Sequence, residues 1–337
     1  MRTKQSKFWT LVGEYFDEYL TKVRRMSSGT VGTYRYGLYA FADFIVKNLA
    51  IQPRTISFDT FTRENVKRYV SWMGKEAGLA TATCNLRLSI IKSFLKYCSE
   101  EDMKYVPTYI MIAAIPLQKN PQKTVEYMSE QALKVLLKQP DPKTLFGSRD
   151  MMILIFMYDT ACRVQELVDV KLGDLKIDCD IPFVRISGKG GKTRNVPLMG
   201  KTTEHLKQYC KGWHVQDKNG PLFYAKKRGV PTKLSTDAIS VLVKKYGEMG
   251  RLSCCEIPPR CYPHLLRKTR AMHLYVKGMP LEQVANFLGH ANSASISYYA
   301  KANTEMLGKS IAKANPEITS QIKVWKEPDL LKRLCGL

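Results

Sequence analysis

The chain has 337 residues and a formal net charge of +23, from 53 Lys and Arg against 30 Asp and Glu, and 45% of it is hydrophobic. This composition excludes a largely disordered chain, and the most apolar run, residues 151–157, is too short to cross a membrane. The length predicts about two domains, and the surplus of positive charge favours a nucleic-acid partner over a membrane surface.

The first part, residues 1–114, is predicted to form a helical bundle. Apolar residues recur at three- and four-residue steps over residues 8–19, 30–47, 62–73 and 81–98. The third pattern follows Thr62, which suits the N-cap of a helix, and the fourth begins at about Thr81. Four amphipathic helices of this kind make a small bundle. Its polar faces carry candidate contacts to DNA phosphates, for which a solvated surface is the alternative: Arg63, Lys67, Arg68, Arg87, Lys92 and Lys96.

Residues 115–124, IPLQKNPQKT, hold two prolines and little apolar content, which predicts a linker. Residues 125–315 then form the predicted second domain. Ser129 is expected to cap a helix that runs to about Lys138, and Ser148 to open a strongly apolar helix that ends near Cys162. A tail, residues 316–337, follows and is a candidate subunit-exchange helix.

The pattern changes in the middle of this second domain. Two strands, residues 183–187 and 193–198, flank the glycine-rich turn GKGGK and predict a β-hairpin. Helical patterns return from about Thr202 and Ser235, over residues 264–276 and over residues 281–288. The fold class is therefore mainly α with a small β-sheet or hairpin: an N-terminal helical bundle and an α+β second domain.

A set of chemically suited residues follows the linker. In chain order they are Arg163 in ACRVQEL, Lys189 in the hairpin turn, His264 and Arg267 in HLLRKT, His290 in LGHAN, and the pair Tyr298-Tyr299. Taken singly, each has an ordinary structural explanation. Together they have one use at a phosphodiester: guanidiniums hold the non-bridging oxygens, histidines bond them or move a proton, a lysine protonates the leaving oxygen, and a tyrosine attacks phosphorus.

At these residues the sequence resembles the tyrosine recombinase (phage integrase) family over most of its length. ACRVQEL is similar to the first arginine box, ISGKGGKTRNVPL to the lysine hairpin, and YPHLLRKT through LGHAN to the second box and the approach to the nucleophile. The resemblance implies a SAM-like core-binding domain, the linker and a catalytic domain. It is of the compact two-domain type, found in mobile-element integrases or transposases and in Xer-like enzymes.

The resemblance also assigns roles. Arg163 and Arg267 would bind the phosphate, His264 would accept a proton or bind phosphate, and His290 would be the third-box histidine. Lys189 would be the general acid, with Lys192 as runner-up. Tyr299, nine residues after His290, would be the nucleophile, with Tyr298 the lesser possibility, and Glu166 would support Arg163 from one helical turn away. The remaining basic residues near these motifs are candidate DNA contacts: Lys192, Arg194, Lys268 and Arg270.

The implied function is a site-specific DNA recombinase that works through a 3′-phosphotyrosyl intermediate and a Holliday junction, integrating or excising a mobile element. The alternatives are a chromosome-dimer-resolving recombinase, a type IB topoisomerase-like strand transferase, and a DNA-binding regulator without catalysis. The implied partners are double-stranded DNA, a homotetramer in the synaptic complex formed from monomers in solution, and an accessory DNA-bending factor. No metal, cofactor or membrane is implied. The absence of a secretion signal and the odd number of cysteines predict a cytoplasmic, nucleoid-associated protein.

Overall fold

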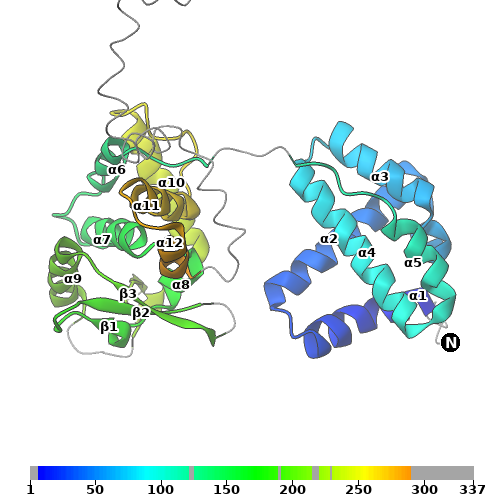
Figure 1. Cartoon of the computed structure of the whole chain (residues 1–337), viewed down its shortest axis with the longest axis horizontal. Coiled ribbons are helices and arrows are strands. Elements are labelled where there is room, and N and C mark those ends of the chain that lie inside the picture. Colours follow the sequence, from blue (N-terminus) through cyan, green and yellow to red (C-terminus); the bar gives the residue numbers. More distant parts are fainter. Residues whose placement is uncertain (1–6, 121–124, 189–190, 215–219, 228–229, 290–337) are drawn as a thin grey trace, which may run out of the picture. The chain divides into compact units, whose positions relative to one another are not determined.

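The computed structural model describes residues 7–120, 125–188, 191–214, 220–227 and 230–289. The chain separates into two compact units, Met1–Gln122 and Lys123–Leu337 (Figure 1). The predictions for Lys189, His290, Tyr298, Tyr299 and the tail 316–337 lie outside the described residues. Within the described ranges, no helix has both the length and the apolar character that crossing a bilayer requires.

The first unit is helical throughout. Its longer elements are α1 (Lys7–Glu14), which continues as the π-helix η1 (Tyr15–Val23), then α2 (Ser28–Asn48), α3 (Arg63–Lys75), α4 (Thr81–Glu101) and α5 (Val106–Ala113). Short 3₁₀ turns occur at Pro53–Thr55, Phe58–Thr60 and Met103–Tyr105. The predicted cap at Thr62 is confirmed, because its side chain accepts a hydrogen bond from the Asn65 amide.

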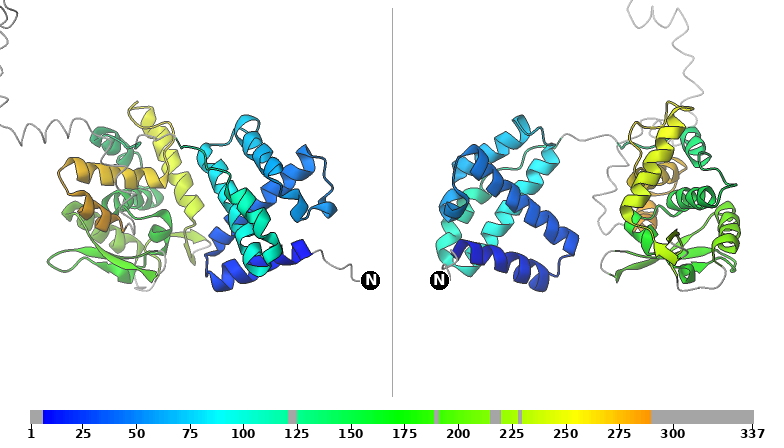
Figure 2. Two further views of the ribbon diagram at one scale, coloured as in Figure 1. Left: turned by 45° about the vertical axis from the view of Figure 1, so that its right-hand side comes forward. Right: turned by 180° about the vertical axis from the view of Figure 1, so that it is seen from behind.

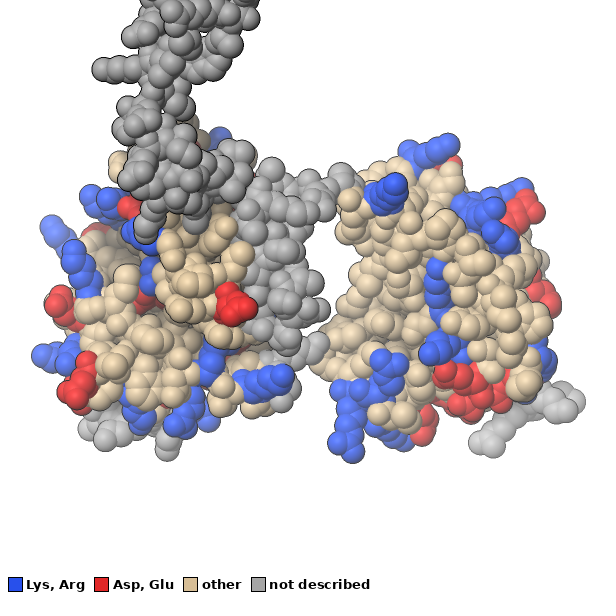
Figure 3. Space-filling view, viewed as in Figure 1, with Lys and Arg blue, Asp and Glu red and all other residues tan. Residues whose placement is uncertain are grey.

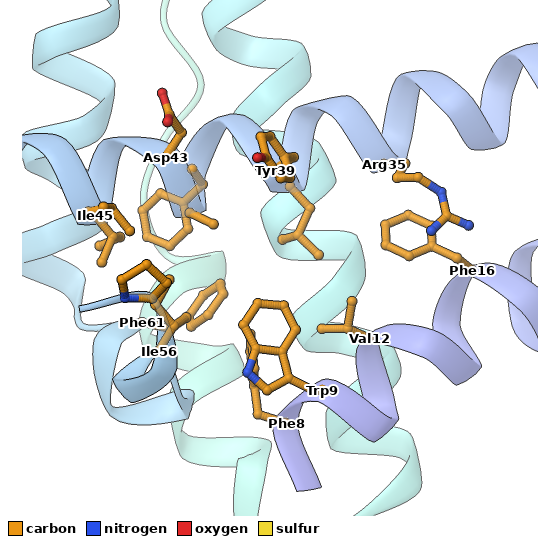
Figure 4. Close-up of a pocket in the computed structure, with 15 residues that line it drawn as sticks. Phe8, Trp9, Val12, Phe16, Arg35, Tyr39, Asp43, Ile45, Ile56 and Phe61 are labelled. Carbon is orange, nitrogen blue, oxygen red and sulfur yellow. The ribbon is translucent and has the colours of Figure 1, made fainter. Parts of the chain in front are cut away.

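An aromatic core holds this bundle together. Tyr15, Phe41, Tyr69 and Phe94 are almost completely buried, and their rings meet others at tilted or edge-on angles. Between α1 and α2 the packing leaves an apolar cavity of about 430 Å³, which Phe8, Trp9 and Phe61 help to line (Figure 4). Burial of the apolar stripes in this aromatic core stabilises the helices at these positions.

The end of the first unit is fixed to α4 by side chains. Asn85 exchanges two hydrogen bonds with the backbone of Gln118, at 2.8 and 2.9 Å. The Lys92 ammonium donates to the carbonyls of Ala113, at 3.0 Å, and Ile115, whose side chain is buried in the aromatic core. The first residues of the segment predicted as a linker are therefore part of this unit.

The second unit combines seven helices with two small antiparallel sheets in its described part. The helices are α6 (Glu130–Leu137), α7 (Leu145–Thr160), α8 (Val164–Asp169), α9 (Gly200–Trp213), α10 (Thr236–Arg251), α11 (Pro263–Val276) and α12 (Leu281–Leu288). The strands are β1 (Leu175–Lys176), β2 (Phe183–Ser187), β3 (Thr193–Pro197), β4 (Tyr224–Lys227) and β5 (Val230–Lys233). The helix α11 packs against α7 and α12 (Figures 1 and 2).

The predicted cap of the second unit at Ser129 is confirmed, because its hydroxyl accepts from the Ala132 amide. The helical pattern predicted from about Ser235 is the helix α10, which Ser235 itself caps. The predicted start of α7 at Ser148 is wrong. The helix begins three residues earlier, at Leu145, where Thr144 caps it by accepting from the Gly147 amide, and Ser148 lies inside its first turns. The sequence pattern did not identify Thr144 as the N-cap, because Leu145 and Phe146, which follow it, are exposed and do not belong to the buried face of the helix.

The predicted hairpin forms the centre of a three-stranded sheet with the order β1-β2-β3. In its register Val184 pairs with Val196 and Ile186 with Arg194, which places Arg194 near the tip of the hairpin. Val184, Ile186 and Val196 are buried, so one face of the hairpin packs in the core. The Gly188 amide donates to the Lys192 carbonyl and closes the turn at 2.7 Å. The strand β2 lies against α8, which brings the hairpin beside the first arginine motif.

Candidate active site

The first arginine motif lies at a sharp turn between two helices. The helix α7 ends at Ala161, whose φ of +47° is in the left-handed region, and Arg163 then occupies the N-cap position of α8. The Arg163 amide donates to Oε2 of Glu166 at 2.9 Å, so the glutamate caps the helix start. The Arg163 side chain stays 42% exposed at this position, where a ligand can reach it.

Glu166 is the buried centre of a charged cluster. Its Oε1 accepts from Nη1 of Arg163 at 2.8 Å and from Nη1 of Arg194 at 3.1 Å, and its Oε2 accepts from Nη2 of Arg194 at 2.8 Å. Burial alone would raise the pKa of Glu166, but the hydrogen bonds from Arg194 and Arg163 outweigh it and lower the pKa to about 2. The carboxylate is therefore charged at any working pH.

Arg267 lies under this cluster on α11 and is 1% exposed. Its Nη1 donates to the Ala161 carbonyl at 2.6 Å and its Nη2 to the Leu288 carbonyl at 2.7 Å. Burial and the charge of Arg163 lower the pKa of Arg267 to about 10, which still leaves it protonated at neutral pH. Its Nε is buried without a hydrogen-bond partner among the described residues, so the guanidinium keeps donors for an anion.

His264 lies in the first turn of the same helix, one turn before Arg267. Partial burial of the ring and the charges of Arg267, Lys268 and Arg163 lower its pKa. The imidazole is therefore neutral near pH 7, the form that can accept a proton. Arg163, His264 and Arg267 thus share one cationic neighbourhood that suits a phosphodiester.

Comparisons with known proteins identify the family of the chain. Residues 126–306 match the phage integrase family, and residues 14–102 match the phage integrase N-terminal SAM-like domain. The chain belongs to the phage integrase family, the tyrosine recombinases. Its members cleave and rejoin DNA through a tyrosine intermediate. The family confirms the fold class predicted from the sequence: a SAM-like helical domain and a catalytic domain with small antiparallel sheets.

Two relatives are similar over nearly the whole recombinase. The integrase/recombinase y4rC of Sinorhizobium fredii is 25% identical over 99% of this chain and 100% of its own length. The tyrosine recombinase XerC of Herpetosiphon aurantiacus is 28% identical over 87% of this chain and 90% of its own. Among solved structures, the Tn1549 transposon integrase in complex with circular intermediate DNA shares the fold, with a TM-score of 0.67 at 15% identity over 90% of this chain and 99% of that chain.

Some of the residues predicted to contact DNA phosphates instead bind other groups of the protein. Arg194 and Arg270 are mostly buried; Arg194 binds Glu166 and Arg270 binds Asp159 at 3.1 Å. Lys92 donates to backbone carbonyls at the end of the first unit. Lys268 lies beside the Tyr262 ring, and Arg87 lies beside Tyr36 and Tyr69. All the other candidates are at the surface or half-buried: Arg63, Lys67, Arg68, Arg87, Lys96, Lys192 and Lys268. Figure 3 shows Lys and Arg side chains scattered over the visible side of both units, with Asp and Glu side chains among them.

Sequence reasoning missed two buried polar residues that support α11. His273 accepts from the Tyr158 hydroxyl at Nδ1 and donates to the Met128 carbonyl from Nε2, both at 2.9 Å. Asp159 accepts from Arg270 and from the Met199 amide, which starts α9. Both residues bond partners 40 to 145 positions away, a separation that no local pattern reveals.

Proposed function

We propose that this recombinase cleaves and rejoins double-stranded DNA at specific sites, with Tyr299 as the nucleophile. The phenolic oxygen of Tyr299 attacks the scissile phosphorus, a phosphotyrosyl ester forms at the 3′ side, and the bond to the 5′ oxygen breaks. The free 5′-hydroxyl of a partner duplex then attacks that ester and releases the tyrosine. Two such rounds pass through a Holliday junction, and bond energy is conserved throughout, so no cofactor is needed.

The observation that carries this proposal is the cationic cluster of Arg163, His264 and Arg267. Two guanidiniums with unused donors, on adjacent elements, suit the charge that develops on the non-bridging oxygens in the transition state. The neutral imidazole of His264 accepts the proton of the attacking phenol or bonds the phosphate. Lys189 protonates the leaving 5′ oxygen, with Lys192 as runner-up, and His290 completes the phosphate contacts.

A covalent-trap experiment tests the proposal. A duplex carrying a nick close to the cleavage site loses its short 5′ fragment after attack, so the protein stays attached to the DNA. We expect the wild-type chain and Tyr298→Phe to give an adduct on a denaturing gel, and Tyr299→Phe to give none. An adduct that persists in Tyr299→Phe, or that disappears only in Tyr298→Phe, would contradict the assignment of the nucleophile.

We favour a role in moving a mobile element, because the similar y4rC is named an integrase and the similar Tn1549 protein is a transposon integrase. The similarity to XerC proteins supports the second candidate, resolution of chromosome dimers. Excision of DNA between repeats that flank the gene would support the first role. Recombination at one fixed chromosomal site, with no mobile segment released, would support the second.

The proposed assembly is a homotetramer on two duplexes, formed from monomers in solution with or without a DNA-bending factor. Exchange between two sites needs four active tyrosines, one for each strand cut. Relaxation of a supercoiled plasmid without a cognate site, by a monomer, would instead identify a topoisomerase-like enzyme. Cross-linking of the protein on the nicked duplex distinguishes a tetramer from a monomer.

A further inference from the structure

Arg194 lies at a junction between three parts of the site. It stands on β3 near the tip of the hairpin, paired with Ile186 of β2. Its two terminal nitrogens bond the two different oxygens of Glu166, a bidentate geometry that fixes both partners. Glu166 in turn holds Arg163 by its backbone amide and by its guanidinium. The orientation of Arg163 therefore depends on a contact that begins on another element.

The other side of Arg194 packs against the end of α12. Gly289 caps that helix with a φ of +65°, and a Cβ placed there would lie 3.1 Å from both Cδ and Nη1 of Arg194. Such a distance is tighter than ordinary van der Waals contact, so a Cβ would press on the arginine and glycine permits the close approach. The guanidinium is thus enclosed between the Glu166 carboxylate and the backbone that follows Leu288.

Two buried arginines consequently connect the same two chain segments. Arg267 joins the carbonyls of Ala161 and Leu288, and Arg194 joins Glu166 to the Gly289 turn. Since Ala161 and Glu166 flank Arg163 in the chain, the pair fixes the chain on both sides of Arg163. Arg194 is itself only 15% exposed, and its Nε, like that of Arg267, is buried with no hydrogen-bond partner among the described residues. Its terminal nitrogens, however, bond the charged carboxylate of Glu166, whereas those of Arg267 bond neutral carbonyls, and this neutralisation argues against a direct contact of Arg194 with DNA.

We propose that Arg194 is a positioning residue that orients Arg163 toward the scissile phosphate through Glu166. This inference rests on the proposed function, because it concerns the same reaction. It replaces the role of DNA contact that the sequence alone suggests for Arg194. A small misplacement of a group that stabilises a transition state lowers the rate strongly, whereas binding of the DNA duplex depends on many other phosphate contacts.

The first test measures the rate of adduct formation at saturating nicked duplex. We expect Arg194→Ala to slow it about 100-fold while DNA affinity stays within about threefold. Arg194→Lys keeps the charge but has a single nitrogen that cannot bond both carboxylate oxygens, so we expect a similar loss of rate. A loss of DNA affinity without a loss of rate, or full activity in Arg194→Lys, would identify a phosphate contact and overturn the proposal.

The second test uses a substrate whose cleavage does not need the charge of Arg163. In a methylphosphonate a methyl group replaces one non-bridging oxygen, so the scissile group carries no charge for a guanidinium to stabilise. We expect the defects of Arg194→Ala and Arg163→Ala both to shrink to about tenfold or less on at least one diastereomer. An Arg194→Ala defect of equal size on both substrates, while Arg163→Ala recovers, would show that Arg194 does not act through Arg163.

Arg270→Ala is the matched control. Arg270 is also an arginine of the second unit, 14% exposed and paired with a buried carboxylate, but its partner is Asp159. A merely structural loss of an ion pair would slow both variants equally on both substrates, and that result would also overturn the proposal. Circular dichroism and DNA binding of each variant report folding. If the wild-type chain itself forms no adduct, the proposed function fails and not this inference.

Discussion

At the scale of single residues, the charge on Glu166 is the feature on which the site depends. The glutamate is 4% exposed and would be unfavourable there as a lone ion, but it accepts four hydrogen bonds from two arginines. The low pKa follows from these bonds. The carboxylate therefore contributes to stability as well as to the orientation of Arg163.

The pH dependence of folding checks this charge. The folded pKa of Glu166 is lowered to about 2 from an ordinary 4.5, so its contribution is complete above the unfolded pKa and is lost as the pH falls toward about 2. We expect the stability advantage of the wild-type second unit over Glu166→Gln to shrink by about 3 kcal/mol between about pH 5 and about pH 2. Urea titrations read by hydrogen exchange in α7 and α8 measure it; a constant difference would contradict the charged cluster.

His264 gives a second prediction at this scale. Partial burial and the surrounding cations lower its pKa, so the ring should titrate below the ordinary value of 6.5 in the free protein. Removing one cation in Lys268→Gln should raise the titration midpoint, because less repulsion acts on the protonated ring. Nuclear magnetic resonance of the imidazole carbon, assigned by loss of the signal in His264→Gln, measures both. A midpoint that Lys268→Gln leaves unmoved would show that the Lys268 charge does not lower the pKa of His264.

At the scale of elements, the end of α12 and the strand β3 are coupled through Gly289 and Arg194. Gly289→Ala places a side chain at positive φ, at a cost of about 1–2 kcal/mol, and also against Arg194. We expect the same substitution to cost about 1 kcal/mol less in the Arg194→Ala background, where the contact is gone. The urea titrations measure this double-mutant cycle, and purely additive costs would show that the two groups do not press on each other.

Sequence patterns identified the elements whose signal is local. The stripes at residues 8–19 and 81–98, the caps at Thr62 and Ser129, and the hairpin all lie where predicted. The helix α5 was missed because eight mostly apolar residues show no periodic face, and the two-residue strand β1 is too short for a pattern. The roles of Arg194 and Arg270 were missed because their carboxylate partners lie 28 and 111 residues away.

At the scale of the whole molecule, positive charge is shared by both units: residues 1–122 carry 18 basic and 10 acidic residues, and residues 123–337 carry 35 and 20. DNA affinity should therefore fall steeply with salt, because each neutralised phosphate releases counterions. We expect Lys67→Met to reduce the slope of log affinity against log salt by about 1. Lys92→Met should leave the slope unchanged and lower stability, because Lys92 binds carbonyls. Fluorescence anisotropy of labelled duplex gives both slopes, and equal slopes would contradict this distinction.

The attachment of Gln118 to Asn85 also limits the length of chain that joins the two units. With Gln118 fixed to the first unit and Val125 packed in the second, only seven peptide steps separate the two anchors. A fully stretched chain of that length covers at most about 25 Å, somewhat more than the width of a DNA duplex. The distance between these two anchors therefore has an upper limit of about 25 Å, and inserting residues between them is a direct way to raise that limit.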